Sequence, residues 1–325
     1  MICRSLRTVR KLYTVLVRPN RPNAVRIREK HDGKPSLSGR LSLTPADVVI
    51  PINDVEGLSK YSAEEKADRC KLASFYRLVG LWGWDQLIYN HITLRLSDNK
   101  SYLINPLGLT FSEITASSLV KVNINGDVID PGSTDLDVNL AGYVLHSAIH
   151  SAREDARCVA HVHTPPGAGV SCMKCGFMMI SQEAMSVGEV AYHDYTGLVV
   201  NDEEKESIQK DLGPTASLLV LRSHGLVALG DTIEACFRIL YDAVRACEIQ
   251  VAALAGGIEN IVLPNISPDE VWKAMKLQGG DGVSRLSWRS GLLEWESQMR
   301  ILDRLGYKTG QEYETKSAIN NSLFK

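Results

Sequence analysis

Helix-forming and strand-forming patterns alternate along this chain from about residue 60 onward, and no linker separates them. Apolar residues recur at helical spacing in some segments and form short valine-rich or alternating runs in others. Interleaved elements of this kind bury their apolar faces against one another, so they share one core. The pattern therefore predicts a single α/β domain of roughly 250 residues, without internal repeats.

Four helices are predicted from capping signals and apolar spacing. The clearest start is a capping box, in which Ser62 is followed by Glu65. The clearest end is Gly256-Gly257, because glycine readily adopts the left-handed conformation that closes a helix. The predicted helices run from Ser62 to about Gly80, from Ser133 or Thr134 to about Ala152, from Asp231 to about Ala255 and, with a weaker pattern, from Leu292 to Leu305.

Strands are predicted where alternating or β-branched residues lie between turn signals. The strongest turn signal is Asn125-Gly126, a dipeptide favoured in tight hairpins. Another run, CVAHVH, is short, rich in valine and followed by two prolines, which is typical of a buried strand. The predicted strands cover residues 91–96, 102–105, 120–124, 128–129, 158–163 and 217–222.

Three histidines form the candidate site. Residues i and i+2 of a strand point to the same face, so His161 and His163 are expected to project side by side. His224 comes where another strand ends, and Gly225 after it allows a sharp turn that brings in a third imidazole. Three protein ligands with an open fourth position is the arrangement of a catalytic divalent metal. We therefore predict a metal site at His161, His163 and His224.

The spacing alone leaves an alternative, since His-x-His also occurs where each imidazole simply satisfies a hydrogen bond. His146 and His150 share a helix face at i, i+4, but the glutamate of H-E-x-x-H is missing, so they are interpreted as packing or surface residues. His91 and His193 lie beside polar residues and are candidate neighbours of the site.

Seven cysteines lie without a regular framework and are odd in number, which favours free thiols in a reducing compartment. Cys172 and Cys175 form one C-x-x-C. One interpretation of this motif is half of a zinc site, or a redox pair. Because no second pair accompanies it, we favour two core thiols.

The composition limits the classes of partner. Hydrophobic residues are 44% and charged residues 23% of the chain, as in ordinary globular proteins. The net charge of −2 argues against general affinity for nucleic acid, which requires a basic surplus. No run approaches the roughly 18 apolar residues of a membrane-spanning helix. Neither a nucleic-acid partner nor a membrane span is expected.

The first 30 residues are basic, and Glu29 is their only acid. Arg4, Arg7 and Lys11 fall near one helical face, with apolar residues towards the other. This composition is typical of a mitochondrial presequence, and a disordered basic tail is the alternative. The predicted organisation is a disordered segment at 1–54, a domain at 55–312 and a short polar tail at 313–325.

Several longer strings resemble the class II aldolase/adducin family. The strings PGST (131–134), AHVHT (160–164) and LRSHGL (221–226) look like the family at large. Others look like the head domain of adducins in particular, and the resemblance covers about residues 60 to 310. These adducin-like strings lie at residues 82–93, 104–109, 113–122, 188–195, 246–251 and 299–310.

The resemblance implies a three-layer α/β/α fold around a mostly antiparallel sheet, and a homotetramer with its site near a subunit interface. It also implies zinc, or another divalent metal such as manganese, because the family's aldolases bind zinc through histidines that match His161, His163 and His224. Kinship with adducins further implies contacts with spectrin and actin. Adducins carry a lysine-rich end for these contacts, and this sequence has no such block, so actin capping is not carried over directly.

Two positions depart from the family's aldolases. Ungapped alignment from the strand places Gly142 where those enzymes carry an acid/base glutamate, which contributes roughly 10²–10⁴ in rate. Asp135, Asp137, His193 and Tyr195 are candidate substitutes. The sugar-phosphate positions read Asn90-His91, Leu107-Gly108 and Leu140-Ala141, and the leucines and alanine lack side-chain donors for a dianion. A phosphosugar substrate is therefore not expected.

Two functions follow as expectations. The first is an adducin-head-like, metal-binding oligomeric domain associated with the actin and spectrin cytoskeleton. The alternative is a metal-dependent lyase, epimerase or decarboxylase acting on a small unphosphorylated hydroxy-carbonyl or keto-acid compound. The expected location is cytoplasmic or cytoskeletal for the first and mitochondrial for the second, and intracellular for both. Catalytic residues are not assigned, since the sequence does not identify a base.

Overall fold

Eight strands form one sheet in the computed structural model, which describes residues 49–195, 202–267, 270–271 and 291–314. Their order across the sheet is β4-β3-β2-β1-β5-β8-β7-β6, and neighbours run antiparallel except the parallel pair β6 and β7. The prediction of a mostly antiparallel sheet is confirmed. The strands are β1 (His91–Arg95), β2 (Ser101–Ile104), β3 (Val120–Asn123), β4 (Val128–Asp130), β5 (Cys158–Val162), β6 (Val190–His193), β7 (Leu218–Leu221) and β8 (Gly225–Gly230).

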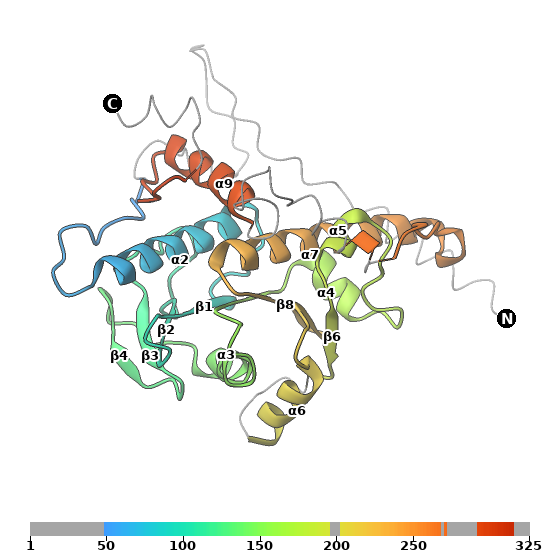
Figure 1. Ribbon diagram of the computed structural model, residues 1–325, viewed down its shortest axis with the longest axis horizontal. Helices are drawn as coiled ribbons and strands as arrows, with labels where there is room; N and C mark the ends of the chain where they lie inside the picture. Colours follow the sequence, from blue (N-terminus) through green and yellow to red (C-terminus); the bar gives the residue numbers. More distant parts are fainter. Residues whose placement is uncertain (1–48, 196–201, 268–269, 272–290, 315–325) are drawn as a thin grey trace, which may run out of the picture. The chain divides into compact units, whose positions relative to one another are not determined.

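Helices cover both faces of this sheet, which gives the predicted three layers (Figure 1). One face carries α2 (Ala63–Leu81), α4 (Pro165–Ser171), α5 (Gln182–Ser186), α7 (Ile233–Ala253) and α9 (Leu292–Arg304). The other face carries α3 (Leu140–Ala152) and α6 (Asp202–Leu212). Two short 3₁₀ turns, η1 (Leu254–Gly256) and η2 (Ile258–Asn260), follow α7.

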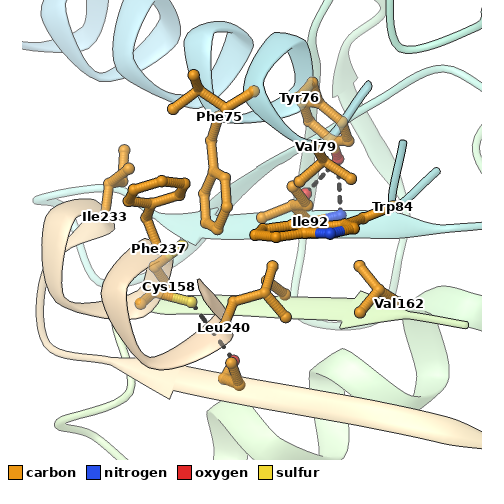
Figure 2. Packing of buried hydrophobic residues seen from close by; sticks show 14 of the residues in the cluster. Phe75, Tyr76, Val79, Trp84, Ile92, Cys158, Val162, Ile233, Phe237 and Leu240 are labelled. Atoms are coloured by element: carbon orange, nitrogen blue, oxygen red, sulfur yellow. Dashed lines mark hydrogen bonds between the residues drawn. The ribbon is translucent and has the colours of Figure 1, made fainter. Parts of the chain in front are cut away.

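The main core lies between the sheet and the layer that contains α2 and α7. Figure 2 shows Phe75 and Val79 of α2, Ile92 of β1, and Phe237 and Leu240 of α7 meeting there. The rings of Phe75 and Phe237 meet edge to face, with centroids 5.7 Å apart. This arrangement is favourable because a positive ring edge meets a negative ring face. Helix α2 therefore buries Phe75 and Val79 against the sheet and α7.

Strand β5 is buried on both faces, which explains why it is apolar except at His161. Cys158, Ala160 and Val162 belong to the main core. Val159 belongs to a second core, against α3 and α6. Because side chains alternate along a strand, His161 also points towards this second layer. The strand thus delivers a histidine to the α3 face of the sheet.

Helix starts differ from the prediction at two of the three caps. Ser62 caps α2 as predicted, since its Oγ accepts a hydrogen bond from the Glu65 N–H at 3.1 Å. Neither Ser133 nor Thr134 caps α3, because the helix begins later, and Asn139 accepts from the Gly142 N–H at 3.1 Å. Thr232, not Asp231, caps α7. Several neighbouring side chains with an oxygen atom are each able to cap a helix. The one that does so is the one at which the backbone becomes helical, and the sequence does not show where that is.

The pair Pro165-Pro166 was interpreted only as the end of a strand, and it also begins a helix. Thr164 caps α4 by accepting from the Gly167 N–H at 3.2 Å. Proline is well suited to the first helical position, because its missing N–H would have no partner there. The helices α4, α5 and α6 and the strands β6 and β8 were not predicted, since each is short or weakly patterned.

The described chain begins within the segment expected to be disordered. Ile52 is fully buried, and its N–H donates to the Tyr307 carbonyl at 2.6 Å. The folded part therefore includes a few residues before position 55. The predicted presequence at residues 1–48 lies outside the described residues, as do residues 315–325 of the predicted tail. Within the described part, none of the helices is long and apolar enough to cross a membrane.

Candidate metal centre

The three predicted histidines meet at one point. Nε2 of His161 lies 2.6 Å from Nε2 of His163 and 3.2 Å from Nε2 of His224, and the last two atoms are 2.9 Å apart. Among the described residues, they form the one group of three or more potential ligand side chains whose donor atoms all lie within 4.8 Å of one another. The histidines come from two parts of the sheet. His161 is in β5 and His163 follows it, whereas His224 lies in the turn between β7 and β8.

The backbone conformation of the turn that carries His224 differs from the prediction. The residue with a left-handed backbone is Ser223, at a φ of 57°, and not Gly225. Gly225 is needed because a Cβ there would lie 2.6 Å from the Val162 carbonyl oxygen and 2.8 Å from the His163 ring. The Ser171 hydroxyl also accepts a hydrogen bond from the His224 N–H at 3.1 Å. Close approach of β8 to β5 therefore sets the position of His224.

Hydrogen bonds at the far side of two rings orient them towards the cluster. Nδ1 of His161 donates to the Leu226 carbonyl at 3.0 Å, so its Nε2 carries the lone pair. Nδ1 of His163 lies 2.5 Å from the side-chain oxygen of Gln86, which has the same effect. Partners of this kind fix the tautomer and orientation of metal-binding histidines.

The pKa values of all three histidines favour the neutral form. Burial lowers the pKa of His161 well below its usual value, and neighbouring imidazoles add to the effect. Burial and then His224 lower the pKa of His163 to about 4. Burial alone lowers the pKa of His224. Metal ions bind the unprotonated imidazole, so these residues are in the correct state at neutral pH.

The donor set fits a divalent ion. Three unprotonated nitrogens with converging lone pairs repel one another unless a cation lies between them. Three imidazole nitrogens are a preferred ligand set of zinc, whereas manganese prefers oxygen ligands. Within the described chain the group contains no fourth protein ligand, which matches a site that leaves one coordination position open.

Of the four suggested substitutes for the missing base, Tyr195 lies against the cluster. Its ring centroid is 4.2 Å from that of His224. His193 lies elsewhere, where Nδ1 is 2.8 Å from Asp211 and Nε2 is 3.1 Å from Glu204. Asp135 and Asp137 are exposed. Tyr195 is partly buried, and this burial raises the pKa of its hydroxyl, so it remains protonated at neutral pH.

His91 is a true neighbour of the centre. Its Cα pairs with that of His161 across β1 and β5, and the two ring centroids are 5.1 Å apart. A Cβ on Gly142 would collide with the His91 ring. The space that a larger residue at position 142 would need is therefore filled by imidazole.

A buried hydrogen-bonded chain continues from His91 into the α3 layer. His91 Nδ1 lies 2.7 Å from His146 Nε2, and His146 Nδ1 lies 2.6 Å from the Thr93 hydroxyl. That hydroxyl lies 2.8 Å from His150 Nε2, and His150 Nδ1 lies 2.9 Å from the Ala156 carbonyl. His146 and His150 are thus buried and partnered, not surface residues. A sequence signal was present, since His91 and Thr93 share a strand face and His146 and His150 share a helix face.

The C-x-x-C pair does not consist of core thiols. Cys172 and Cys175 are both exposed free cysteines. They follow α4, in a turn at the surface where the chain leaves the core. Neither belongs to the metal-binding group found among the described residues.

The positions expected to hold a phosphate offer few donors. Leu140 is 56% exposed at the start of α3, and Ala141 beside it is also exposed. A Cβ added at Gly108 would be in van der Waals contact with the Leu136 side chain. Asn90 is buried, and neither atom of its amide has a partner within the described structure. One amide beside the site does not make a dianion pocket, and an eroded phosphate site stays a prediction.

Comparison with known proteins gives consistent matches. The family described as "Class II Aldolase and Adducin N-terminal domain" matches residues 70–251. The chain is 53% identical over 275 residues to alpha-adducin of Rattus norvegicus and 45% identical over 274 residues to beta-adducin of Homo sapiens. These matches cover 82% of this chain but only 37% and 38% of those proteins. The chain therefore spans less than two fifths of the curated relatives it resembles.

Two solved structures are also similar. An aldolase II superfamily protein from Pseudomonas syringae is 38% identical with a TM-score of 0.69, over 78% of this chain and 98% of that one. An L-fuculose 1-phosphate aldolase from Glaciozyma antarctica is 26% identical with a TM-score of 0.62, over 78% and 96%. Both matches cover more than three quarters of this chain.

Proposed function

This chain belongs to the class II aldolase and adducin family, and on that premise we propose that its domain binds one divalent metal ion through His161, His163 and His224 and acts as an adducin-head-like oligomeric module. The observation that carries the proposal is the convergence of three Nε2 atoms from one buried and two half-buried imidazoles, all of which favour the neutral form. When bound, the ion would supply Lewis acidity or structural cross-linking between β5 and the β7–β8 turn. Zinc fits this nitrogen donor set best.

A binding module is favoured over an aldolase by the neighbourhood of Gly142. Enediolate formation needs a base beside the polarised carbonyl, and glycine supplies none. The His91 ring fills the adjacent space, so the glutamate of related enzymes would not fit without rearrangement. Tetramer formation and association with actin or spectrin are proposed on the basis of kinship with adducins.

Metal content tests the metal proposal. Full-length protein purified from unsupplemented medium is expected to retain about one equivalent of zinc per chain, because three imidazoles and a fixed geometry hold the ion. His224→Ala is expected to lower this to below about a tenth. His193→Gln is the matched control, because His193 is a buried histidine outside the cluster. A wild-type protein with under about a tenth of an equivalent of any divalent metal would refute the proposal.

The assembly proposal needs a separate measurement. Sedimentation velocity of the full chain is expected to show a tetramer, and co-sedimentation is expected to show binding to actin filaments or to spectrin–actin mixtures. A monomer that remains in the supernatant with both would refute this part. The metal result would be unaffected by that outcome.

A second function, a metal-dependent lyase, epimerase or decarboxylase, is favoured by the open coordination position. Within the described residues the cluster offers three ligands, so a small carbonyl compound has a place to bind. The test is turnover of hydroxy-aldehydes, hydroxy-ketones and keto acids by the zinc-loaded protein. Activity that disappears in His161→Ala would establish this function over a purely structural metal.

A further inference from the structure

We propose that His91 is a further binding residue of this centre, whose Nε2 is held as an unprotonated acceptor for a hydroxyl or N–H group of the bound molecule. The proposal rests on the proposed metal function for the identity of the site. It adds the chemical class of the ligand, namely an uncharged hydroxy-carbonyl compound. It depends on the direction of the buried hydrogen-bonded chain behind His91.

A backbone carbonyl sets that direction. The Ala156 oxygen only accepts, so His150 Nδ1 must carry the proton in their 2.9 Å contact. Neutral His150 then accepts at Nε2, and the Thr93 hydroxyl must be the donor to it at 2.8 Å. Burial lowers the pKa of His150 to about 3, which keeps this ring neutral. The first two links therefore have only one arrangement of protons.

The remaining links follow in the same direction. Because the Thr93 proton is used, its oxygen accepts from His146 Nδ1 at 2.6 Å. His146 Nε2 is then unprotonated and accepts from His91 Nδ1 at 2.7 Å. In neutral His91 the single ring proton is at Nδ1, which leaves a lone pair on Nε2. No hydrogen bond within the described structure uses that Nε2 atom.

The position of His91 suits a ligand contact and not metal coordination. It packs against the His161 ring, but it does not belong to the group whose donor atoms lie within 4.8 Å of one another. Gly142, which has no side chain, borders its Nε2 edge. Under this proposal, a bound molecule places one oxygen at the ion and a neighbouring hydroxyl at His91 Nε2.

The lone pair also discriminates between ligands. A hydroxyl or amide N–H donates to it, whereas a carboxylate or phosphate oxygen presents a second lone pair and is repelled. This agrees with the lack of side-chain donors at Leu107, Leu140 and Ala141, which is unsuited to a dianion. Hydroxy-ketones and hydroxy-aldehydes fit both requirements, while ionised keto acids lack the donor for the lone pair.

Nitrogen NMR of the full chain with ¹⁵N-labelled histidine tests the tautomer without any ligand. The chemical shift of an unprotonated ring nitrogen lies far downfield of a protonated one, and His91→Gln identifies the signals of His91. We expect an unprotonated Nε2 in both metal-free and zinc-loaded protein. Thr93→Val, which removes the hydroxyl at similar volume, is expected to mix the tautomers, and Thr93→Ser is expected to preserve them. A protonated Nε2 in wild type overturns the proposal.

Ligand binding tests the consequence. Hydroxyacetone and methoxyacetone share a carbonyl, but only the first has a hydroxyl donor. With the cobalt-loaded protein, whose visible spectrum reports ligand binding, hydroxyacetone is expected to bind about tenfold more tightly, as one hydrogen bond to a buried acceptor allows. The ratio should approach one in Thr93→Val and persist in Thr93→Ser. Equal affinities in wild type, or binding of neither compound, overturn the ligand class.

The two proposals fail in different ways. If the chain takes up no metal, the proposed metal function fails, while NMR of the metal-free chain still decides the state of His91. If metal is bound and His91 Nε2 is protonated, only the inference about His91 fails.

Discussion

At the scale of single residues, two glycines shape the candidate centre through the volume they leave. Gly142 makes room for the His91 ring, and Gly225 lets β8 approach β5. Both positions have ordinary φ values, so their requirement is steric and not conformational. The sequence pattern pointed to Gly225 for the wrong reason, because a glycine beside a turn is normally explained by its backbone freedom.

Gly225→Ala is expected to weaken the metal centre. The new Cβ would meet the Val162 carbonyl and the His163 ring, so one or both must shift by several tenths of an ångström. Displacement of a ligand or its support lowers metal affinity about 10–100-fold, and overpacking costs about 1–3 kcal/mol of stability. Competition with a chromophoric chelator measures the first effect and urea unfolding the second.

Gly169→Ala is the matched control for this substitution. It lies in α4, and an added Cβ there has no neighbour within 4 Å. We expect unchanged metal affinity and unchanged or slightly higher stability, since alanine favours a helix more than glycine does. Metal affinity in Gly225→Ala equal to that of this control would contradict the steric explanation.

At the scale of elements, one buried arginine joins α2 to the β3–β4 hairpin. Arg69 is fully buried, and its guanidinium donates to Glu65 at 3.0 Å, to the Leu119 carbonyl at 2.7 Å and to Asp130 at 3.3 Å. Its guanidinium also lies 3.9 Å from the Tyr61 ring centroid. In a capping box the glutamate side chain accepts from the N-cap N–H. The Glu65 carboxylate instead contacts Arg69 and Lys121.

Arg69→Met is expected to lower the free energy of unfolding by about 3–5 kcal/mol, because it leaves buried acceptors and carboxylates without their cation. Lys60→Met is the control, since Lys60 contacts the same Asp130 from an exposed position. An exposed ion pair contributes about 0–1 kcal/mol. Chemical denaturation of both variants decides the question, and equal losses would show that Arg69 acts only through its packed aliphatic part.

At the scale of the whole molecule, the histidines make stability depend on pH. His91, His146, His150 and His161 are all buried, and burial lowers the pKa of each in the folded protein, to about 3 for His91 and His150. In the unfolded chain each has an ordinary value near 6.5. The unfolded state therefore binds more protons between about pH 6.5 and the folded pKa values, and protons favour unfolding there.

We expect the free energy of unfolding to be constant above about pH 7 and to fall below it by up to about 1.4 kcal/mol per pH unit for each such histidine. Urea denaturation of metal-free protein between pH 7.5 and 5 measures the slope. His150→Gln should reduce this slope by the contribution of one histidine, about 1.4 kcal/mol per pH unit. A slope that is flat from pH 7 to 5 would be incompatible with four neutral buried imidazoles. Bound zinc is expected to steepen the dependence, because protons compete for its ligands.

The sequence was sufficient for features that depend on local spacing. Ser62 and Glu65 located the start of α2, Asn125-Gly126 located a hairpin, and His161 and His163 were placed on one face because alternation in a strand is a property of the backbone itself. Adducin-like strings extended this to a three-layer fold. These conclusions were reliable because each rests on residues close together along the chain.

The tertiary structure decided how distant residues meet, including His224, which the sequence had already grouped with His161 and His163. His224 reaches the other two histidines because β8 pairs with β5, and His91 reaches them because β1 pairs with the opposite edge of β5. Packing of α3 on β1 then joins Thr93, His146 and His150 into one directed chain. Spacing in the sequence indicates which of these residues share a face, but it does not predict that the two faces meet. The physical reason is that hydrogen bonds and metal ligands act over about 3 Å, so they depend on strand order and helix packing, which are determined by the whole core.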